Sequence, residues 1–142
     1  MTAITTRADR RRGAVGTVTE DSLLRFALRA DATLCAGLGL LTAIASDPLS
    51  KATGLTSTAE WIAGAALVVY GAGLYLLAGA PRVRPVGVGV LAGNIAFAIV
   101  VTVVLIAGWL PLTELGVVAT IAFTAATLGF AYAQYLGVRR LA

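Results

Sequence analysis

Four long apolar segments joined by short polar turns make up most of the chain. They lie at about 20–46, 59–80, 86–110 and 114–138. The third is the most apolar, because Asn94, Thr102 and the indole of Trp109 are its only polar side chains. A helix rises ~1.5 Å per residue, so roughly 20 apolar residues cross a hydrocarbon core of ~30 Å. The pattern therefore predicts four transmembrane helices.

The composition agrees with this pattern: 58% of the residues are hydrophobic and 13% are charged, with a mean hydropathy of +0.89. All three values lie outside the range of soluble domains. We expect an all-α polytopic membrane protein, and the short turns favour an antiparallel four-helix transmembrane bundle over 19–142. Residues 1–18 hold four arginines and no apolar periodicity, which predicts a disordered basic cytoplasmic tail.

Basic residues predict the orientation in the membrane. Ten of the 11 fall on one side, namely six up to Arg29, two in the turn at 81–85 and two at the C-terminus, whereas Lys51 lies on the other. By the positive-inside rule both termini are cytoplasmic, in a multi-pass protein of the bacterial inner membrane. Because these charges flank apolar spans, we expect membrane lipids and not nucleic acid as their partners.

Capping signals mark the helix ends. Thr17-x-x-Glu20 and Ser57-x-x-Glu60 have the spacing of capping boxes, and Thr113 is placed to cap the last helix. The link between the first two spans predicts a short interfacial helix. Its expected cap is Asp47, followed by Pro48 at the first helical position and Gly54 as terminator.

The first link also allows a cleavage alternative. Ala43 and Ala45 before Ser46 resemble a signal-peptidase site, which would leave a mature three-helix protein. The long segment before the apolar stretch and the acid at Asp31 favour the uncleaved chain.

Hydrogen-bonding side chains of all four helices fall in the cytoplasmic half. Asn94 lies ~12 Å deep and Asp31 ~7 Å deep, if the helices are regular. Since lipid cannot satisfy such groups, we expect them to face inward. The predicted polar cluster comprises Arg29, Asp31, Tyr70, Asn94, Tyr132 and Gln134. The partners expected for Asp31 are Asn94, Tyr132, Arg84 or Arg139.

Two interpretations of this cluster stay open. In one, interhelical hydrogen bonds only set the helix register, at ~0.6 to 2 kcal/mol each. In the other, a cavity open to the cytoplasm lets Asp31 bind a cation, a proton or a polar headgroup, because intramembrane ionisable residues are commonly functional.

Small residues recur at helical spacing. The runs are Gly89-xxx-Gly93, Ala32-xxx-Ala36 and Ala125-xxx-Gly129-xxx-Ala133. Such runs let helix backbones approach closely. The run on the last helix is the longest and is the strongest prediction of a packing face.

The chain has few side chains of the types that carry out catalysis. The chain has no histidine, which excludes imidazole bases and histidine metal sites. Its single cysteine, Cys35, lies in an apolar span, where we expect an inert small hydrophobe. The sequence predicts no enzyme, no cofactor and no metal site.

Some short patterns resemble those of a known group. They are L-R-x-A-L-R-x-D-A over 24–32, a link holding Asp47-Pro48-Leu49 and Gly54-Leu55, and one Asn early in the third span. In these features the chain resembles small four-helix bacterial integral membrane proteins of unassigned function, over roughly 23–141. The alanine, valine, glycine and arginine content resembles that of an actinobacterium. The resemblance implies the four-helix fold and no particular activity.

Two functions are consistent with these features. The first is an accessory or oligomerising subunit that works through helix packing, with a second copy or another membrane protein as partner. The alternative is a small transporter or channel with a cytoplasm-facing polar cavity around Asp31 and Asn94.

Overall fold

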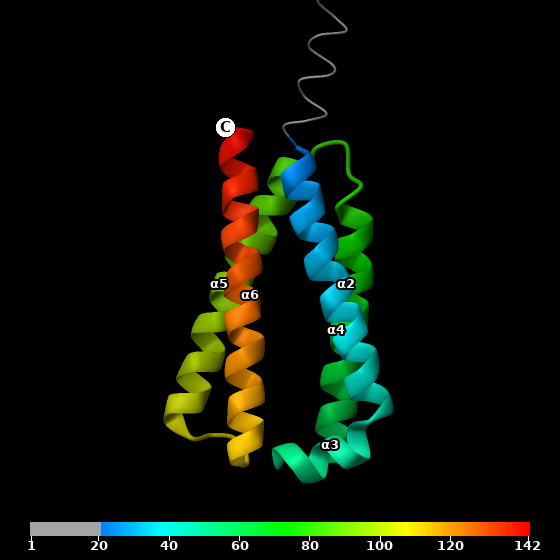
Figure 1. The fold of residues 1–142 in the computed structure, drawn as a ribbon, viewed down its shortest axis with the longest axis vertical. Helices are drawn as coiled ribbons and strands as arrows, with labels where there is room; N and C mark the ends of the chain where they lie inside the picture. The colour runs from blue at the N-terminus through cyan, green and yellow to red at the C-terminus, as the bar shows by residue number, and fades with distance from the viewer. Residues whose placement is uncertain (1–20) are drawn as a thin grey trace, which may run out of the picture.

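The structure, a computed structural model, describes residues 21–142, and all of its regular elements are helices. They are α2 (Ser22–Ile44), α3 (Ser46–Thr53), α4 (Ser57–Leu77), α5 (Val83–Ala107) and α6 (Glu114–Arg140) (Figure 1). All except α3 are long and apolar enough to cross a membrane. The predicted all-α class with four such helices is confirmed. The predicted tail at 1–18 and the Thr17-x-x-Glu20 box lie outside the described residues.

The boundaries of α5 follow from its proline and glycine. The helix begins at Val83 rather than at 86 and takes Pro85 into its first turn, where a missing N–H costs nothing because the first N–H groups have no partner within the helix. It ends before Gly108, which has a φ of 65°. This left-handed conformation is favourable for glycine and terminates the helix.

The caps predicted for α6 and α4 have different outcomes. Thr113 accepts a hydrogen bond from Gly116 N at 3.1 Å, as predicted. The Ser57 cap is wrong, because α4 is capped one residue earlier by Thr56, which accepts from Ala59 N at 3.1 Å. Glu60 is therefore released from the capping box and accepts a hydrogen bond from the hydroxyl of Thr53 on α3.

The start of α3 also differs from its prediction. It begins at Ser46, with Ala45 at the cap position and no side-chain capping bond, so Asp47 is not the cap. Helix α3 follows α2 almost without a break, because Ala45 N still donates to Leu41 O at 2.9 Å in the hydrogen-bond pattern of α2. Gly54 ends α3 with a φ of 87°, as predicted.

The helices form two antiparallel hairpins, α2 with α4 and α5 with α6 (Figure 1). Helix α2 also packs on α6, which joins the hairpins, whereas α4 and α5 contact each other at most marginally. The α2–α4 contact depends on glycine: a methyl group at Gly71 would lie 2.5 Å from Ala32 O, and one at Gly64 would lie 2.5 Å from Ala43 N. The Ala32-xxx-Ala36 run therefore does pack closely.

The other two small-residue runs behave differently. A methyl group added at Gly89, Gly93 or Gly129 would meet no atom within 4 Å. These positions face open space and do not bring the described helices together. The close approach between hairpins instead uses Gly137, where an added methyl group would lie 2.8 Å from Leu24 Cα.

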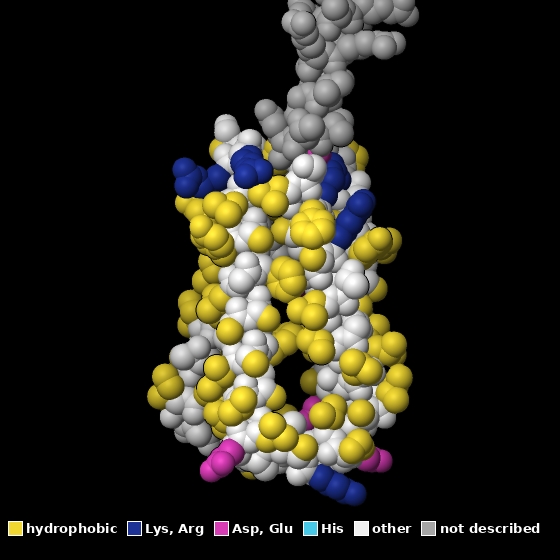
Figure 2. All heavy atoms as spheres, in the orientation of Figure 1, with side chains coloured by type: hydrophobic (Ala, Val, Ile, Leu, Met, Phe, Trp, Pro, Cys, Tyr) yellow, Lys and Arg dark blue, Asp and Glu magenta, His cyan; other side chains and the backbone are white. Residues whose placement is uncertain are grey.

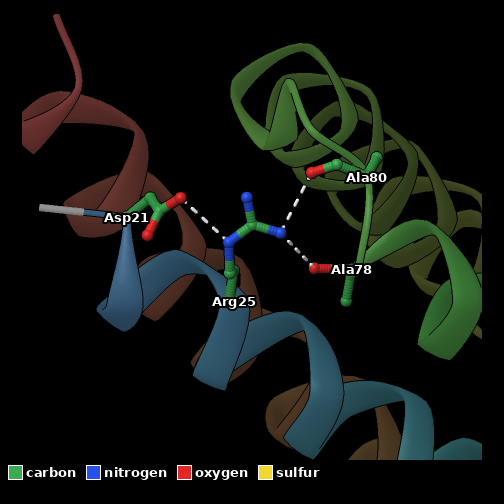
Figure 3. Close-up of polar contacts among 4 residues, drawn as sticks. All are labelled: Asp21, Arg25, Ala78 and Ala80. Atoms are coloured by element: carbon green, nitrogen blue, oxygen red, sulfur yellow. Dashed lines mark hydrogen bonds and ion pairs between the residues drawn. The ribbon is translucent and has the colours of Figure 1, made fainter. Parts of the chain in front are cut away.

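One end of the molecule is basic, as Figure 2 shows. We call it the basic end; its described basic residues are Arg25, Arg29, Arg82, Arg84, Arg139 and Arg140. Arg25 ties α2 to the end of α4, because its guanidinium donates to Asp21 at 2.9 Å and to the carbonyls of Ala78 and Ala80 at 2.8 and 3.0 Å (Figure 3).

An apolar cluster fills the bundle beside the basic end. Its buried members are Leu24, Leu28, Ala32, Leu74, Ala78 and Val83. At the opposite end, which we call the α3 end, Thr113 N donates to Thr53 O at 2.8 Å and the Thr113 hydroxyl donates to Ala52 O. The hairpins thus meet at both ends, while Figure 2 shows openings between them along the lower half.

Candidate functional site

Three polar side chains from three helices meet between the hairpins. Gln134 Nε2 on α6 donates to Asp31 Oδ2 on α2 at 2.8 Å, and Asn94 Nδ2 on α5 donates to the same oxygen at 3.1 Å. Asn94 Nδ2 also donates to Gln134 Oε1 at 3.2 Å. We call Asp31, Asn94 and Gln134 the polar triad.

The hydrogen bonds of the triad determine how its amides are oriented. Asn94 Nδ2 lies between two acceptors, Asp31 Oδ2 and Gln134 Oε1, so this atom must be nitrogen and not oxygen. The three side chains are 3%, 7% and 0% exposed, respectively, for Asp31, Asn94 and Gln134. A polar network this deeply buried is stable because its groups satisfy one another.

The second carboxylate oxygen of Asp31 has a different environment. Among residues 21–142 its one hydrogen bond comes from the Cys35 thiol one turn along α2, at 3.4 Å, and a thiol is a weak donor. Within residues 21–142 the one ion pair is between Arg25 and Asp21. Asp31 is therefore a buried acid without a cationic partner among the described residues.

A cavity of about 320 Å³ adjoins the triad. It is lined by Asp31, Cys35, Leu67, Tyr70, Gly89, Val90, Gly93, Asn94, Phe97, Phe123 and Thr127. Polar groups lie on its buried side, where Thr127 is 9% and Cys35 is 6% exposed. On the other side Tyr70 is 41% exposed and the two glycines of α5 are also exposed. The cavity thus has a polar floor and a mouth of tyrosine and glycine.

The mouth lies between α4 and α5. Tyr70 belongs to α4, Gly89 and Gly93 belong to α5, and these two helices barely touch. The apolar cluster of Leu24 and Leu28 lies between the triad and the basic end. The exposed part of the cavity lining thus lies between helices, on the side away from the apolar cluster, and a cavity open to the cytoplasm stays a prediction.

Three of the six residues predicted for the polar cluster form the triad, and Tyr70 lines its cavity. Arg29 and Tyr132 lie elsewhere. The guanidinium of Arg29 stacks over the Tyr75 ring at 5.8 Å, and Tyr132 is 64% exposed on the outer surface of α6.

Among the partners predicted for Asp31, Asn94 is confirmed. Tyr132 is directed away from the triad by its place on the exposed face of α6. Arg139 stacks over the Tyr135 ring at 5.7 Å, and Arg84 is exposed at the basic end. Arg84 lies ten residues before Asn94 on α5 and Arg139 lies five residues after Gln134 on α6, so both are displaced from the triad toward the basic end.

The two phenylalanines of the site are not among the residues predicted from the sequence. Phe97 on α5 and Phe123 on α6 form an edge-to-face pair with ring centroids 5.8 Å apart, and both line the cavity. The available signal was spacing, since Phe97 follows Asn94 by three residues and Thr127 precedes Gln134 by seven. Positions three, four or seven apart share a helix face.

Within residues 21–142, no three side chains of the types that bind metals (His, Cys, Asp and Glu) come together. Comparisons with protein-family models, with curated proteins and with solved structures found no match.

Proposed function

We propose that this protein is a small transporter in which Asp31 binds a proton or a cation inside the bilayer. The observation that supports it is the asymmetry of the carboxylate. Both amide donors of the triad reach Oδ2, so Oδ1 keeps acceptor capacity, with only the weak Cys35 thiol as donor among the described residues, and Asp31 lines the cavity. An acid inside a membrane requires a proton or a cation to balance its charge.

A purely structural role explains the acid less well. Oδ2 only accepts hydrogen bonds from Asn94 and Gln134, and an amide oxygen accepts hydrogen bonds in the same way. A neutral asparagine at position 31 would therefore hold the three helices together without the cost of burying a charge. The carboxyl group adds one property that the amide lacks, which is the ability to bind and release a positive charge.

The proposed location is the bacterial inner membrane, with multiple spans and both termini in the cytoplasm. It is supported by the grouping of arginines at the basic end, against Lys51 at the α3 end. Positive charge is retained on the cytoplasmic side of membrane proteins. In this orientation the triad lies in the cytoplasmic half of the spans.

Flux measurements in liposomes test the transport function. Purified full-length protein is reconstituted, and the dissipation of a proton, Na⁺ or K⁺ gradient is compared with that in protein-free liposomes. We expect flux with the wild type and background rates with Asp31→Asn. Asp47→Asn is the matched control, because Asp47 is exposed on α3. Equal flux with wild type and Asp31→Asn, or no flux above background for any of the three ions, contradicts the proposal.

A helix-packing function is the second candidate, and one observation favours it. The Ala125-xxx-Gly129 surface of α6 is exposed and a methyl group at Gly129 would meet nothing within 4 Å. A helix of a second copy or of another membrane protein could approach closely there. Native mass spectrometry and cross-linking in mild detergent test this: a dimer that Gly129→Leu dissociates supports it, and a strictly monomeric protein contradicts it.

A further inference from the structure

Building on that proposed function, we infer that the Asp31 site takes an amphipathic organic cation, which enters from the lipid between α4 and α5. Three observations point to this class of ligand: the direction in which the cavity opens, the chemistry of its wall, and its size.

The cavity lies beside the gap between α4 and α5, with the apolar cluster on its other flank toward the basic end. Toward the basic end it is blocked by the apolar cluster that contains Leu24 and Leu28. At the α3 end the hairpins are joined by the hydrogen bonds of Thr113 to Ala52 and Thr53. Helices α4 and α5 make almost no contact and carry the exposed lining residues Tyr70, Gly89 and Gly93, so a lateral route runs between them.

The surface of α5 at this route is smooth. Gly89 and Gly93 are one turn apart on the cavity wall, both are exposed, and neither has any atom within 4 Å of the place where a Cβ would be. In a membrane such a face is bordered by acyl chains, since the long helices expose mainly apolar side chains. A ligand that passes this way must therefore be soluble in lipid.

The side chains that line the cavity favour a ligand with a positive charge. Asp31 supplies an oxygen with free acceptor capacity, and the described residues supply no cation to balance it. Phe97, Phe123 and Tyr70 line the same cavity. Aromatic rings attract cations through their faces, most strongly away from water. A carboxyl group within an aromatic wall suits an ammonium group better than an anion or an uncharged head.

The size sets how much of the ligand is enclosed. About 320 Å³ is near the lower end of small-molecule sites, which span roughly 300–1,000 Å³. The cavity can hold an ammonium head and a short apolar part, while a longer chain extends through the mouth into the lipid. Amphipathic amines with one alkyl chain have this shape.

Binding of radiolabelled decylamine to the full-length protein in nanodiscs tests the inference, with empty nanodiscs as the background. We expect saturable binding that is competed by unlabelled decylamine. Decanol and decanesulfonate, which have the same chain and an uncharged or anionic head, should not compete. Binding that does not saturate, or that decanol competes equally well, is partition into lipid and overturns the inference.

Three variants locate the binding. Asp31→Asn removes the charge and should abolish saturable binding. Gly93→Leu fills the mouth without a clash, because space is open there, and should also abolish it. Gly73→Leu is the matched control: Gly73 is likewise exposed on a helix with nothing within 4 Å, but it does not line the cavity. It should bind as wild type does. Binding that survives Gly93→Leu with unchanged affinity contradicts the lateral route.

The two proposals fail in different ways. Gly93→Leu is used for decylamine binding alone, because Gly93 lines the cavity beside Asp31; Asp31→Asn is compared in both assays. Ion flux that depends on Asp31, without saturable decylamine binding, overturns the inference and leaves the proposed function standing. Saturable binding that depends on Asp31, without any ion flux, overturns ion transport and supports the binding site. Circular dichroism and a monodisperse elution profile check that each variant is folded.

Discussion

Asp31 and Asn94 are 63 positions apart in the chain, and their side chains meet at 3.1 Å in the middle of the bundle. The contact joins the first hairpin to the second, because Asp31 lies on α2 and Asn94 on α5. Few other contacts link these two helices directly. The triad therefore connects the two hairpins at a level between the apolar cluster and the half of the bundle nearest the α3 end.

The first prediction concerns the stability of the triad. Asn94→Ala removes the donor to both Asp31 and Gln134, and we expect the free energy of unfolding to fall by about 1–2 kcal/mol, the scale of interhelical hydrogen bonds in membranes. Asp31→Asn keeps an acceptor in place and should cost less than Asn94→Ala. Unfolding in mixed micelles with increasing sodium dodecyl sulfate measures both. A larger loss for Asp31→Asn would mean that the charge itself stabilises the fold.

Much of this arrangement could be predicted from the sequence, for physical reasons. A span such as 86–110 is long and apolar enough to cross a membrane, and polar groups within such a helix are satisfied by one another, because lipid cannot satisfy them. Depth therefore identified Asp31, Asn94 and Gln134 as neighbours. Depth along a helix does not determine which way a side chain points around the helix axis. Depth alone therefore also predicts Tyr132, two residues before Gln134, for the cluster, although Tyr132 faces outward.

The packing glycines could not be identified from spacing alone. The chain has 16 glycines, so small residues recur at four-residue spacing on several faces. Which of these faces meets another helix depends on how the helices rotate relative to each other. Gly64 and Gly71 are in close contact with α2, whereas Gly89 and Gly93 face the mouth of the cavity. The lateral opening itself depends on the separation of α4 and α5, which no local pattern encodes.

The second prediction tests the glycine contact between α2 and α4. Gly64→Val should destabilise the protein by about 1–3 kcal/mol or more, the usual cost of overpacking, because the new side chain would collide with the backbone at Ala43. Gly73→Val is the matched control on the same helix, where nothing lies within 4 Å. The same unfolding assay compares them. Equal losses of stability for the two variants would show that helix propensity, and not packing against α2, determines the effect of Gly64→Val.

The third prediction addresses orientation. In a Cys35→Ser background, Lys51→Cys should react with a membrane-impermeant maleimide added outside intact cells, because Lys51 is exposed at the α3 end. Arg140→Cys, exposed at the basic end, should react only after the cells are opened. The reverse pattern would invert the topology and place the triad in the outer half of the membrane.

The last prediction separates two roles of one side chain. Thr113 and Thr56 both cap helices, accepting from Gly116 N and Ala59 N at 3.1 Å each, but only the Thr113 hydroxyl also donates to Ala52 O across the gap between hairpins. Replacing a threonine cap with alanine costs about 0.5–2 kcal/mol, so Thr56→Ala measures capping alone. Thr113→Ala should lose about 0.5–1.5 kcal/mol more, the net value of a hydrogen bond. Spin labels on α3 and α6 should then report a wider separation at the α3 end for Thr113→Ala than for Thr56→Ala. Equal losses and an unchanged separation would mean that the backbone bond from Thr113 N to Thr53 O holds the hairpins together by itself.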